Sequence, residues 1–291
     1  MTKLAKLLKK ETWELPWRRE IRLRDKRIAE ADALIARLVA AVAERTEGVV
    51  KPGHPLADAV AVEVDRGPKE QGTVFAFGGL AGHMHIPAAE FRKALSARSY
   101  AVVFAKDLFQ VWYQKGLPGL ANSREAVAPA LKRRFGHLPR PWYAIGASAG
   151  GFAAIVFGTG LGVARVLALS PRTVVKRETA NIYRQTALLD PSLDPMAPLS
   201  DCRDALAESG YKNPLWIIYG VRNPFDRLQA KRLKDHPGVE MMPVNTPGHS
   251  VGAVLKRASL LDPVLDAFFC GDTSAARTHI ERMNDPCPAT T

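Results

Sequence analysis

Ser148 has the neighbours that a nucleophilic serine needs. It stands in Gly146-Ala147-Ser148-Ala149-Gly150, which follows an apolar run of strand length and leads into a helical pattern. In such a nucleophile elbow the serine occupies a strained strand-to-helix turn, and the residues two before and two after it must be small. Gly146 and Gly150 meet that condition. The pentapeptide alone is a weak indication of a nucleophile, because small residues are common wherever a strand of a parallel sheet leads into a helix. Residues elsewhere in the chain must support it.

A serine nucleophile also requires a base and an acid that orients the base, and both follow later strand-like runs. Asp226 comes after the apolar run 215–219, and His249 comes after the run 240–244. In these places the histidine could take the serine proton while the carboxylate holds the histidine. Asp226 stands near a helix start, so its alternative role is only to complement the helix dipole. The alternative acids are Asp190, Asp194, Asp201 and Asp204.

Backbone N–H groups at two places can stabilise an oxyanion. Ala149 begins the helix expected after Ser148, where the helix dipole adds positive charge. A glycine pair ends the earlier run 73–77, and glycine allows the backbone to approach a substrate oxygen closely. The N–H of Gly79 or Leu80 is therefore the expected second donor, with a plain turn as the alternative interpretation.

The remaining histidines and the cysteines do not predict a metal site. His83 and His85 lie two residues apart, but no cysteine, aspartate or third histidine accompanies them nearby. The cysteines are Cys202, Cys270 and Cys287. Their wide spacing fits neither a disulfide framework nor a metal site and favours a reducing compartment. Neither a metal nor another cofactor is expected.

Short β-rich runs alternate with helical patterns after residue 60. The expected strands are 60–64, 73–77, 100–105, 142–147, 165–169, 215–219 and 240–244, and the expected helices are 88–97, 124–134, 149–157, 224–234 and 251–269. Several runs are continuously apolar, which is typical of a mostly parallel sheet with helices on both faces. The alternating run 60–64 is expected at an edge. The sequence thus predicts a doubly wound α/β fold.

Three segments lie outside this pattern. Residues 1–47 are rich in Lys and Arg and predict a helical extension, which either packs on the main domain or lies on an anionic membrane through Lys3–Lys10. Residues 172–213 contain no clear strand and predict a short lid over the nucleophile. The main domain is expected to span 48–271, and residues 272–291 to form a flexible tail.

Composition limits the classes of protein. The 291 residues are 47% hydrophobic, enough for a large α/β core, so disorder of the whole chain is excluded. The formal net charge of +12 suits an anionic partner, but no basic run is interleaved with aromatic residues, and nucleic-acid binding is not predicted. Charged residues interrupt the N-terminal stretch, and the longest apolar run, Ala33–Ala43, is too short for a bilayer. A cytoplasmic location is expected.

Taken together, the motifs resemble those of the α/β-hydrolase superfamily. They are Phe77-Gly78-Gly79, Lys106-Asp107, Trp112-Tyr113, residues 146–154, Leu169-Ser170-Pro171-Arg172-Thr173 and Gly248-His249-Ser250. More narrowly, the chain is similar over residues 70–270 to hydrolase-like proteins associated with bacterial capsular and exopolysaccharide biosynthesis. The resemblance implies Ser148 as nucleophile, Asp226 as acid and His249 as base, with Gly79 and Ala149 near the oxyanion. Many members carry a bulkier residue in place of Ala149, which leaves the donor N–H unchanged.

These observations predict a serine hydrolase of esterase or acyl-transfer type that acts on a small-molecule or glycan ester. Arg172 and Arg177 are expected to attract an anionic substrate, unless they are simply solvated cations of a basic protein. Trp112 and Tyr113 are expected to offer an aromatic wall for an acyl group or sugar. The alternative function is a catalytically silent binding protein with the same fold, acting as the partner of a glycosyltransferase.

Overall fold

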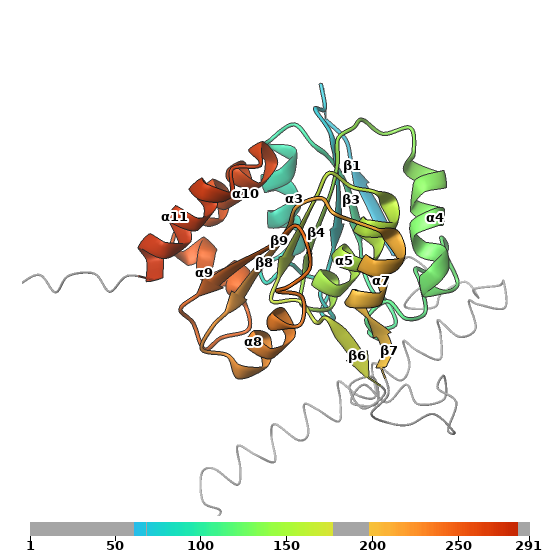
Figure 1. Ribbon diagram of the computed structural model, residues 1–291. Coiled ribbons are helices and arrows are strands. Elements are labelled where there is room, and N and C mark those ends of the chain that lie inside the picture. Colours follow the sequence, from blue (N-terminus) through green and yellow to red (C-terminus); the bar gives the residue numbers. More distant parts are fainter. Residues whose placement is uncertain (1–60, 68, 177–197, 285–291) are drawn as a thin grey trace, which may run out of the picture. The chain divides into compact units, whose positions relative to one another are not determined.

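The computed structural model describes residues 61–67, 69–176 and 198–284 (Figure 1). The chain divides between Ala59 and Val60, and the unit that begins at Val60 holds the sheet. The expected N-terminal extension 1–47 lies outside the described residues. Among the described helices, none is both long and apolar enough to cross a membrane.

The main sheet has seven strands in the order β1-β3-β2-β4-β5-β8-β9. The strands are β1 (Val62–Asp65), β2 (Thr73–Phe77), β3 (Ala101–Ala105), β4 (Trp142–Ala147), β5 (Arg165–Leu169), β8 (Leu215–Gly220) and β9 (Val239–Val244). Only β1 is antiparallel to its neighbour β3, and the other pairs are parallel. The predicted edge position of the first strand is therefore confirmed. All the parallel strands end at one edge of the sheet, where ligands bind in folds of this kind.

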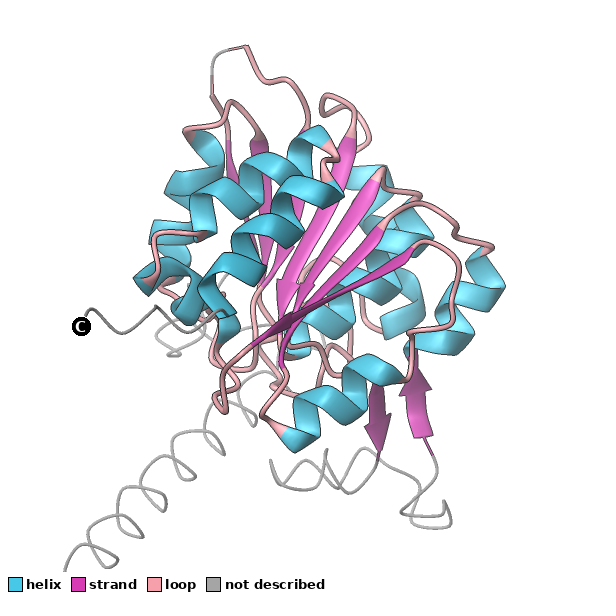
Figure 2. Cartoon of the chain, turned by 60° about the vertical axis from the view of Figure 1, so that its left-hand side comes forward, coloured by secondary structure: helices cyan, strands magenta, loops and turns pink. Residues whose placement is uncertain are grey.

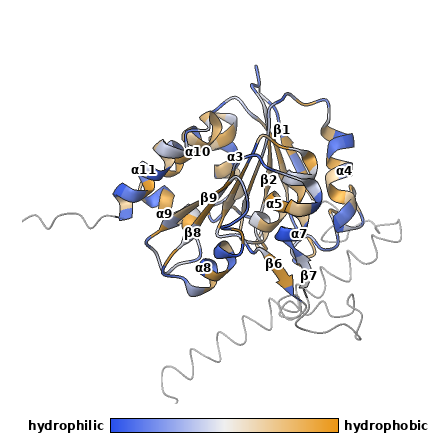
Figure 3. Cartoon of the chain, viewed as in Figure 1, coloured by the Kyte–Doolittle hydropathy of each residue, from blue (hydrophilic) through white to orange (hydrophobic). Residues whose placement is uncertain are grey.

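Helices cover both faces of the sheet (Figures 1 and 2). One face carries α4 (Arg124–Phe135), α5 (Ala149–Leu161) and α7 (Cys202–Ser209), and the other carries α3 (Ala88–Ser96), α9 (Val251–Arg257), α10 (Leu261–Cys270) and α11 (Thr273–Asn284). Successive side chains of β2 alternate between two cores: Phe75 and Phe77 pack with α5, and Val74 and Ala76 pack with α3 and α10. Hydrophilic residues gather on outer helices such as α8 and α11 (Figure 3). The predicted doubly wound α/β fold is confirmed.

The long helix expected over 251–269 is two helices. α9 ends at Arg257 and α10 begins at Leu261, and Ser259 between them has φ of 59°. Pro263 lies in the first turn of α10, where its missing N–H would have no intrahelical acceptor anyway. Inside one continuous helix the same proline would remove a hydrogen bond and clash with the preceding turn.

The prediction of a flexible tail over 272–291 is wrong for residues 273–284. These residues form α11, which buries Ala276 and Ile280 in the core shared with α10. The side chain of Asn284 accepts the N–H of Asn245 at 2.7 Å and donates to the carbonyl of Pro243 at 2.7 Å. The helix is therefore fastened to the end of β9. Residues 285–291 lie outside the described residues.

The predicted insertion 172–213 contains regular structure at both of its ends. β6 (Val174–Lys176) pairs antiparallel with β7 (Pro198–Asp201), and α7 follows directly. The base of this ribbon is fixed to helix α8 (Pro224–Lys231), because the amide oxygen of Gln229 accepts the N–H of Thr173 at 2.8 Å. The expectation of no strand here is wrong at these positions, since strands of three or four residues leave too short a pattern to detect. The role of the insertion as a lid stays a prediction.

Candidate active site

Ser148 occupies a strained turn between β4 and α5. Its φ of 56° and ψ of −115° lie outside the conformations that residues with a Cβ prefer. A Cβ added to Gly146 would lie 1.9 Å from the carbonyl oxygen of Gly150, and one added to Gly150 would lie 1.9 Å from that of Phe77. Glycine is therefore required on both sides of the serine, as the sequence predicted, because the strand and the helix approach too closely for any side chain.

The structure brings Ser148, His249 and Asp226 into one chain of hydrogen bonds. His249 Nε2 lies 2.9 Å from Ser148 Oγ, and His249 Nδ1 lies 2.7 Å from Asp226 Oδ1. Asp226 is buried, whereas the His249 side chain is 36% exposed. In this arrangement Nε2 can accept the serine proton while the buried carboxylate holds the ring through Nδ1–H.

Asp226 also lies in the first turn of α8, so its two proposed roles are compatible. The side chain of Asn223 caps this helix by accepting the N–H groups of Phe225 at 3.1 Å and Asp226 at 3.2 Å. Within the described residues, the second carboxylate oxygen of Asp226 is buried without a hydrogen-bond partner.

The four acids that could have replaced Asp226 do not take its place in the described residues. Asp201 caps α7 and pairs with Arg232. Asp204 is exposed on α7. Asp190 and Asp194 lie outside the described residues. Asp226 is therefore the carboxylate that the structure places against His249.

Of the three predicted oxyanion donors, Ala149 and Leu80 are better placed than Gly79 for that proposed role. The N–H of Ala149 opens α5, where helix N–H groups have no intrahelical acceptor. The N–H of Gly79 already donates to the carbonyl of His83 at 2.9 Å, which removes Gly79 from the predicted set. A Cβ added to Gly79 would lie 3.7 Å from Ser148 Cβ, so the turn that carries Leu80 borders the nucleophile. The Leu80 N–H has no acceptor among the described residues.

The predicted aromatic wall is wrong. Tyr113 is fully buried and Trp112 is 4% exposed, because the loop after β3 folds them into the core beneath α5. The Tyr113 ring lies edge to face with Phe77 and Phe157, at 6.0 Å between ring centroids in each pair. Neither side chain is in a position to stack on a substrate at the sheet edge.

Of the two predicted substrate-binding arginines, Arg172 lies beside the elbow. Its backbone N–H donates to the carbonyl of Ser148 at 3.2 Å, and its guanidinium stacks on the ring of Phe225, 3.6 Å from the centroid. Phe225 is the residue before Asp226 in the chain and, unlike Asp226, is exposed. Arg177 lies outside the described residues.

His85 is a further residue of the site. The sequence alone gives it no role, because the metal site that its spacing from His83 suggests lacks further ligands nearby. Its ring meets the ring of His249 nearly edge to face, with 5.3 Å between the centroids. Its Nδ1 accepts the N–H of Gly252 in α9 at 3.4 Å, which places the proton on Nε2. The sequence feature that could have indicated His85 as a site residue is its position in the loop after β2, which also carries Leu80.

Comparison with known proteins gives a human relative. No family model matches the chain. Human ABHD14B, by its name a candidate protein-lysine deacylase, is 29% identical over 141 residues. The match covers 46% of this chain and 57% of the human protein, so the chain spans little more than half the length of that relative.

MenH from S. aureus shares the arrangement of the sheet and helices. It is 14% identical with a TM-score of 0.50, covering 72% of this chain and 98% of MenH. The carboxylesterase CesB from Bacillus subtilis is 19% identical with a TM-score of 0.47, covering 73% of this chain and 89% of CesB.

Proposed function

The chain has the α/β-hydrolase fold, and we propose that it is a serine hydrolase of esterase or acyl-transfer type. The observation that carries the proposal is the chain of hydrogen bonds from Ser148 through His249 to Asp226. Ser148 follows β4, Asp226 follows β8 and His249 follows β9. The three side chains meet at the edge of the sheet where these strands end. A silent binding protein would have no need for the strained serine, which costs on the order of 1–3 kcal/mol of backbone energy.

The proposed reaction proceeds through an acyl-enzyme. Ser148 Oγ attacks the carbonyl carbon of the substrate, and His249 Nε2 takes the serine proton. The carbonyl oxygen becomes an oxyanion that accepts hydrogen bonds from the N–H groups of Ala149 and Leu80. When the oxyanion collapses, the bond to the leaving group breaks and His249 donates the proton to that group. Water or another acceptor then releases the acyl group from Ser148 by the same steps.

The finer proposal concerns the substrate. Arg172, whose backbone contacts the elbow and whose guanidinium lies over Phe225, supports an anionic acyl or glycan ester, as does the overall excess of basic residues. The resemblance to proteins of polysaccharide biosynthesis supports a glycan acceptor or donor. The human relative supports a second candidate, an acyl group on lysine, because the same acyl-enzyme forms when an amine is the leaving group.

Labelling with a fluorophosphonate probe tests the function without knowledge of the substrate. We expect the probe to modify Ser148 in the folded protein, and Ser148→Ala to abolish the labelling. Ser209→Ala is the matched control, because Ser209 is an exposed serine at the end of α7. His249→Ala should slow labelling about as severely as loss of the serine, and Asp226→Asn should reduce ester turnover by a few orders of magnitude.

Two results would contradict the proposal. A folded wild-type protein that never reacts would leave the silent binding protein as the better function, and labelling that survives Ser148→Ala would place the nucleophile elsewhere. Turnover of a neutral ester and of its anionic analogue at several ionic strengths then tests the substrate charge. Equal specificity constants without salt dependence would remove the anionic substrate and leave the esterase.

A further inference from the structure

The loop after β3 has an unusual backbone. Gln110, Trp112 and Tyr113 all lie in the left-handed region, with φ of 55°, 53° and 59°. Residues with a Cβ rarely adopt this conformation, and three of them within four positions require support from the rest of the structure.

Asp107 supplies part of that support from inside the loop. It is 4% exposed, and its Oδ2 accepts the N–H of Tyr113 at 3.0 Å. Burial raises the pKa of this carboxyl group to about 6, although the backbone N–H groups of the loop counteract the shift. A buried acid thus fixes the backbone at Tyr113 and thereby the direction in which its ring enters the core.

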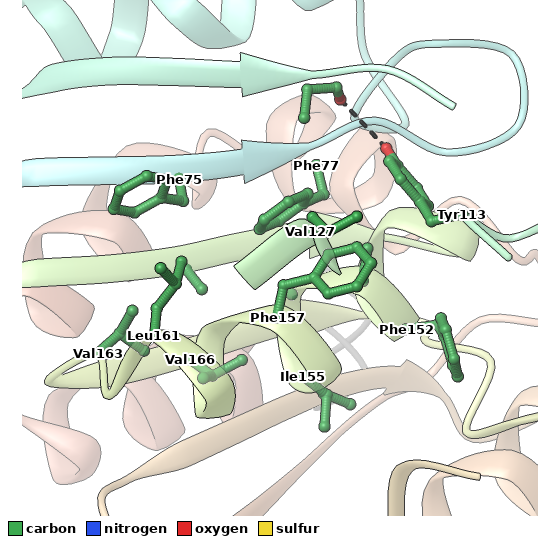
Figure 4. Close-up of a cluster of buried hydrophobic side chains, with 14 of the residues drawn as sticks. Phe75, Phe77, Tyr113, Val127, Phe152, Ile155, Phe157, Leu161, Val163 and Val166 are labelled. Atoms are coloured by element: carbon green, nitrogen blue, oxygen red, sulfur yellow. Dashed lines mark hydrogen bonds between the residues drawn. The ribbon is translucent and has the colours of Figure 1, made fainter. Parts of the chain in front are cut away.

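The ring of Tyr113 carries its hydroxyl group to the end of β2. The ring packs against both Phe77 and Phe157, which also contact each other (Figure 4). The hydroxyl donates to the carbonyl of Gly78 at 2.7 Å and also lies 3.1 Å from the carbonyl of Ala105. Burial holds the pKa of this phenol well above its usual value, so the hydroxyl keeps its proton and remains a donor.

Gly78 begins the turn that carries the proposed oxyanion donor. Gly79 donates to the carbonyl of His83 at 2.9 Å, and its own carbonyl accepts the N–H of Gly82 at 2.7 Å. The peptide group that follows Gly78 is therefore held at its nitrogen by the turn and at its oxygen by Tyr113. Because Gly78 and Gly79 allow wide backbone rotation, a loss of either contact would let the Leu80 N–H change direction.

We propose that Tyr113 is a positioning residue, whose hydroxyl fixes the Gly78 carbonyl and through it the direction of the Leu80 N–H in the oxyanion site. This inference rests on the proposed function. It gives the Asp107–Tyr113 loop a role in the reaction without contact with the substrate. The oxyanion forms only during the reaction, so a misdirected donor lowers kcat and leaves KM nearly unchanged.

The test is Tyr113→Phe, which keeps the ring and removes the hydroxyl. With p-nitrophenyl acetate as the probe substrate, we expect kcat to fall about 10- to 100-fold with KM changed less than about twofold. Amide hydrogen exchange in residues 78–83 should become faster. Tyr211→Phe is the matched control, because Tyr211 is also buried, its hydroxyl has no partner in the described residues, and it precedes the start of β8 at the opposite edge. Tyr211→Phe should change neither kcat nor the hydrogen exchange in residues 78–83.

The outcomes separate this inference from the proposed function. An active wild type with unchanged kcat in Tyr113→Phe would overturn the inference and leave the hydrolase. If the wild type never reacts with a fluorophosphonate, the proposed function fails, and with it the role in the oxyanion site. Hydrogen exchange then tests the structural part of the inference: unchanged exchange in residues 78–83 overturns it, and faster exchange supports the fixing of this turn by Tyr113. Thermal unfolding of both variants ensures that folded proteins are compared. An equal kcat loss in Tyr211→Phe would mean that general loosening of the core, rather than Gly78, is responsible.

Discussion

His85 is held neutral at pH values where an ordinary histidine is charged. Burial lowers its pKa to about 3, and the neighbouring His249 and His83 add to the shift when they are protonated. The ring that faces the proposed base is therefore a neutral imidazole throughout the physiological range. Its Nε2 is buried and has no acceptor in the part of the chain that the structure describes.

This shift predicts a pH dependence of stability. The pKa of His85 is 6.5 in the unfolded chain and about 3 in the folded protein, so below pH 6.5 only the unfolded chain binds the proton. The free energy of unfolding should fall as the pH drops from 6.5 toward 3, by about 2 kcal/mol at pH 5 from this residue. Urea unfolding at pH 7.5 and pH 5 measures the change.

His85→Phe should remove that part of the pH dependence, since it keeps a ring against His249 and cannot take a proton. His137→Phe is the control, because His137 is exposed after α4 and should leave the dependence as it is in the wild type. Equal slopes in the wild type and His85→Phe would show that His85 is protonated in the folded protein, contrary to this prediction.

At the scale of elements, the buried strands were the most predictable part of the fold. Strands β2, β4 and β5 have the predicted bounds, because each is an apolar run of five or six residues ended by Gly, Ser or Pro signals. The ribbon of β6 and β7 escaped notice, since three or four residues carry no periodicity. Helix α11 escaped because it buries few apolar side chains, Ala276 and Ile280 among them.

The candidate site was predictable where chain order determines position. Ser148, Asp226 and His249 each follow a parallel strand, and parallel strands end at a common edge, so their proximity follows from the topology. The positions of Tyr113 and His85 depend on loops with left-handed residues, which leave no periodic pattern in the sequence. From the sequence alone, Tyr113 could therefore be assigned wrongly to an aromatic wall for the substrate, and His85 could be considered only as a metal ligand.

The strand-to-helix elbow gives a prediction about the fold itself. Gly146→Ala should prevent folding or lower the free energy of unfolding by more than about 3 kcal/mol, because the new Cβ would lie 1.9 Å from the Gly150 carbonyl oxygen. Gly67→Ala is the control, since a Cβ there meets nothing within 4 Å. Thermal unfolding followed by circular dichroism compares them. A Gly146→Ala protein as stable as the wild type would mean that the strand and helix can separate without cost.

At the scale of the whole molecule, the sheet and both of its cores lie within the unit that begins at Val60. The first described contact of this unit is the N–H of Lys106, which donates to the carbonyl of Ala61 at 2.8 Å. All strands of the main sheet and all the proposed catalytic residues follow Ala61 in the chain. The proposed catalytic residues therefore all come after the basic segment that precedes Val60.

A chain that begins at Val60 should therefore fold and react like the full-length protein, with equal fluorophosphonate labelling and a Tm within a few degrees. If residues 1–47 lie on an anionic membrane surface, full-length protein should sediment with phosphatidylserine vesicles at low salt and be released at high salt, because screening weakens attraction between exposed charges. The shortened chain should stay in solution in both conditions. An insoluble shortened chain would show that the segment completes the core, and equal sedimentation of both proteins would place any membrane contact on the hydrolase unit itself.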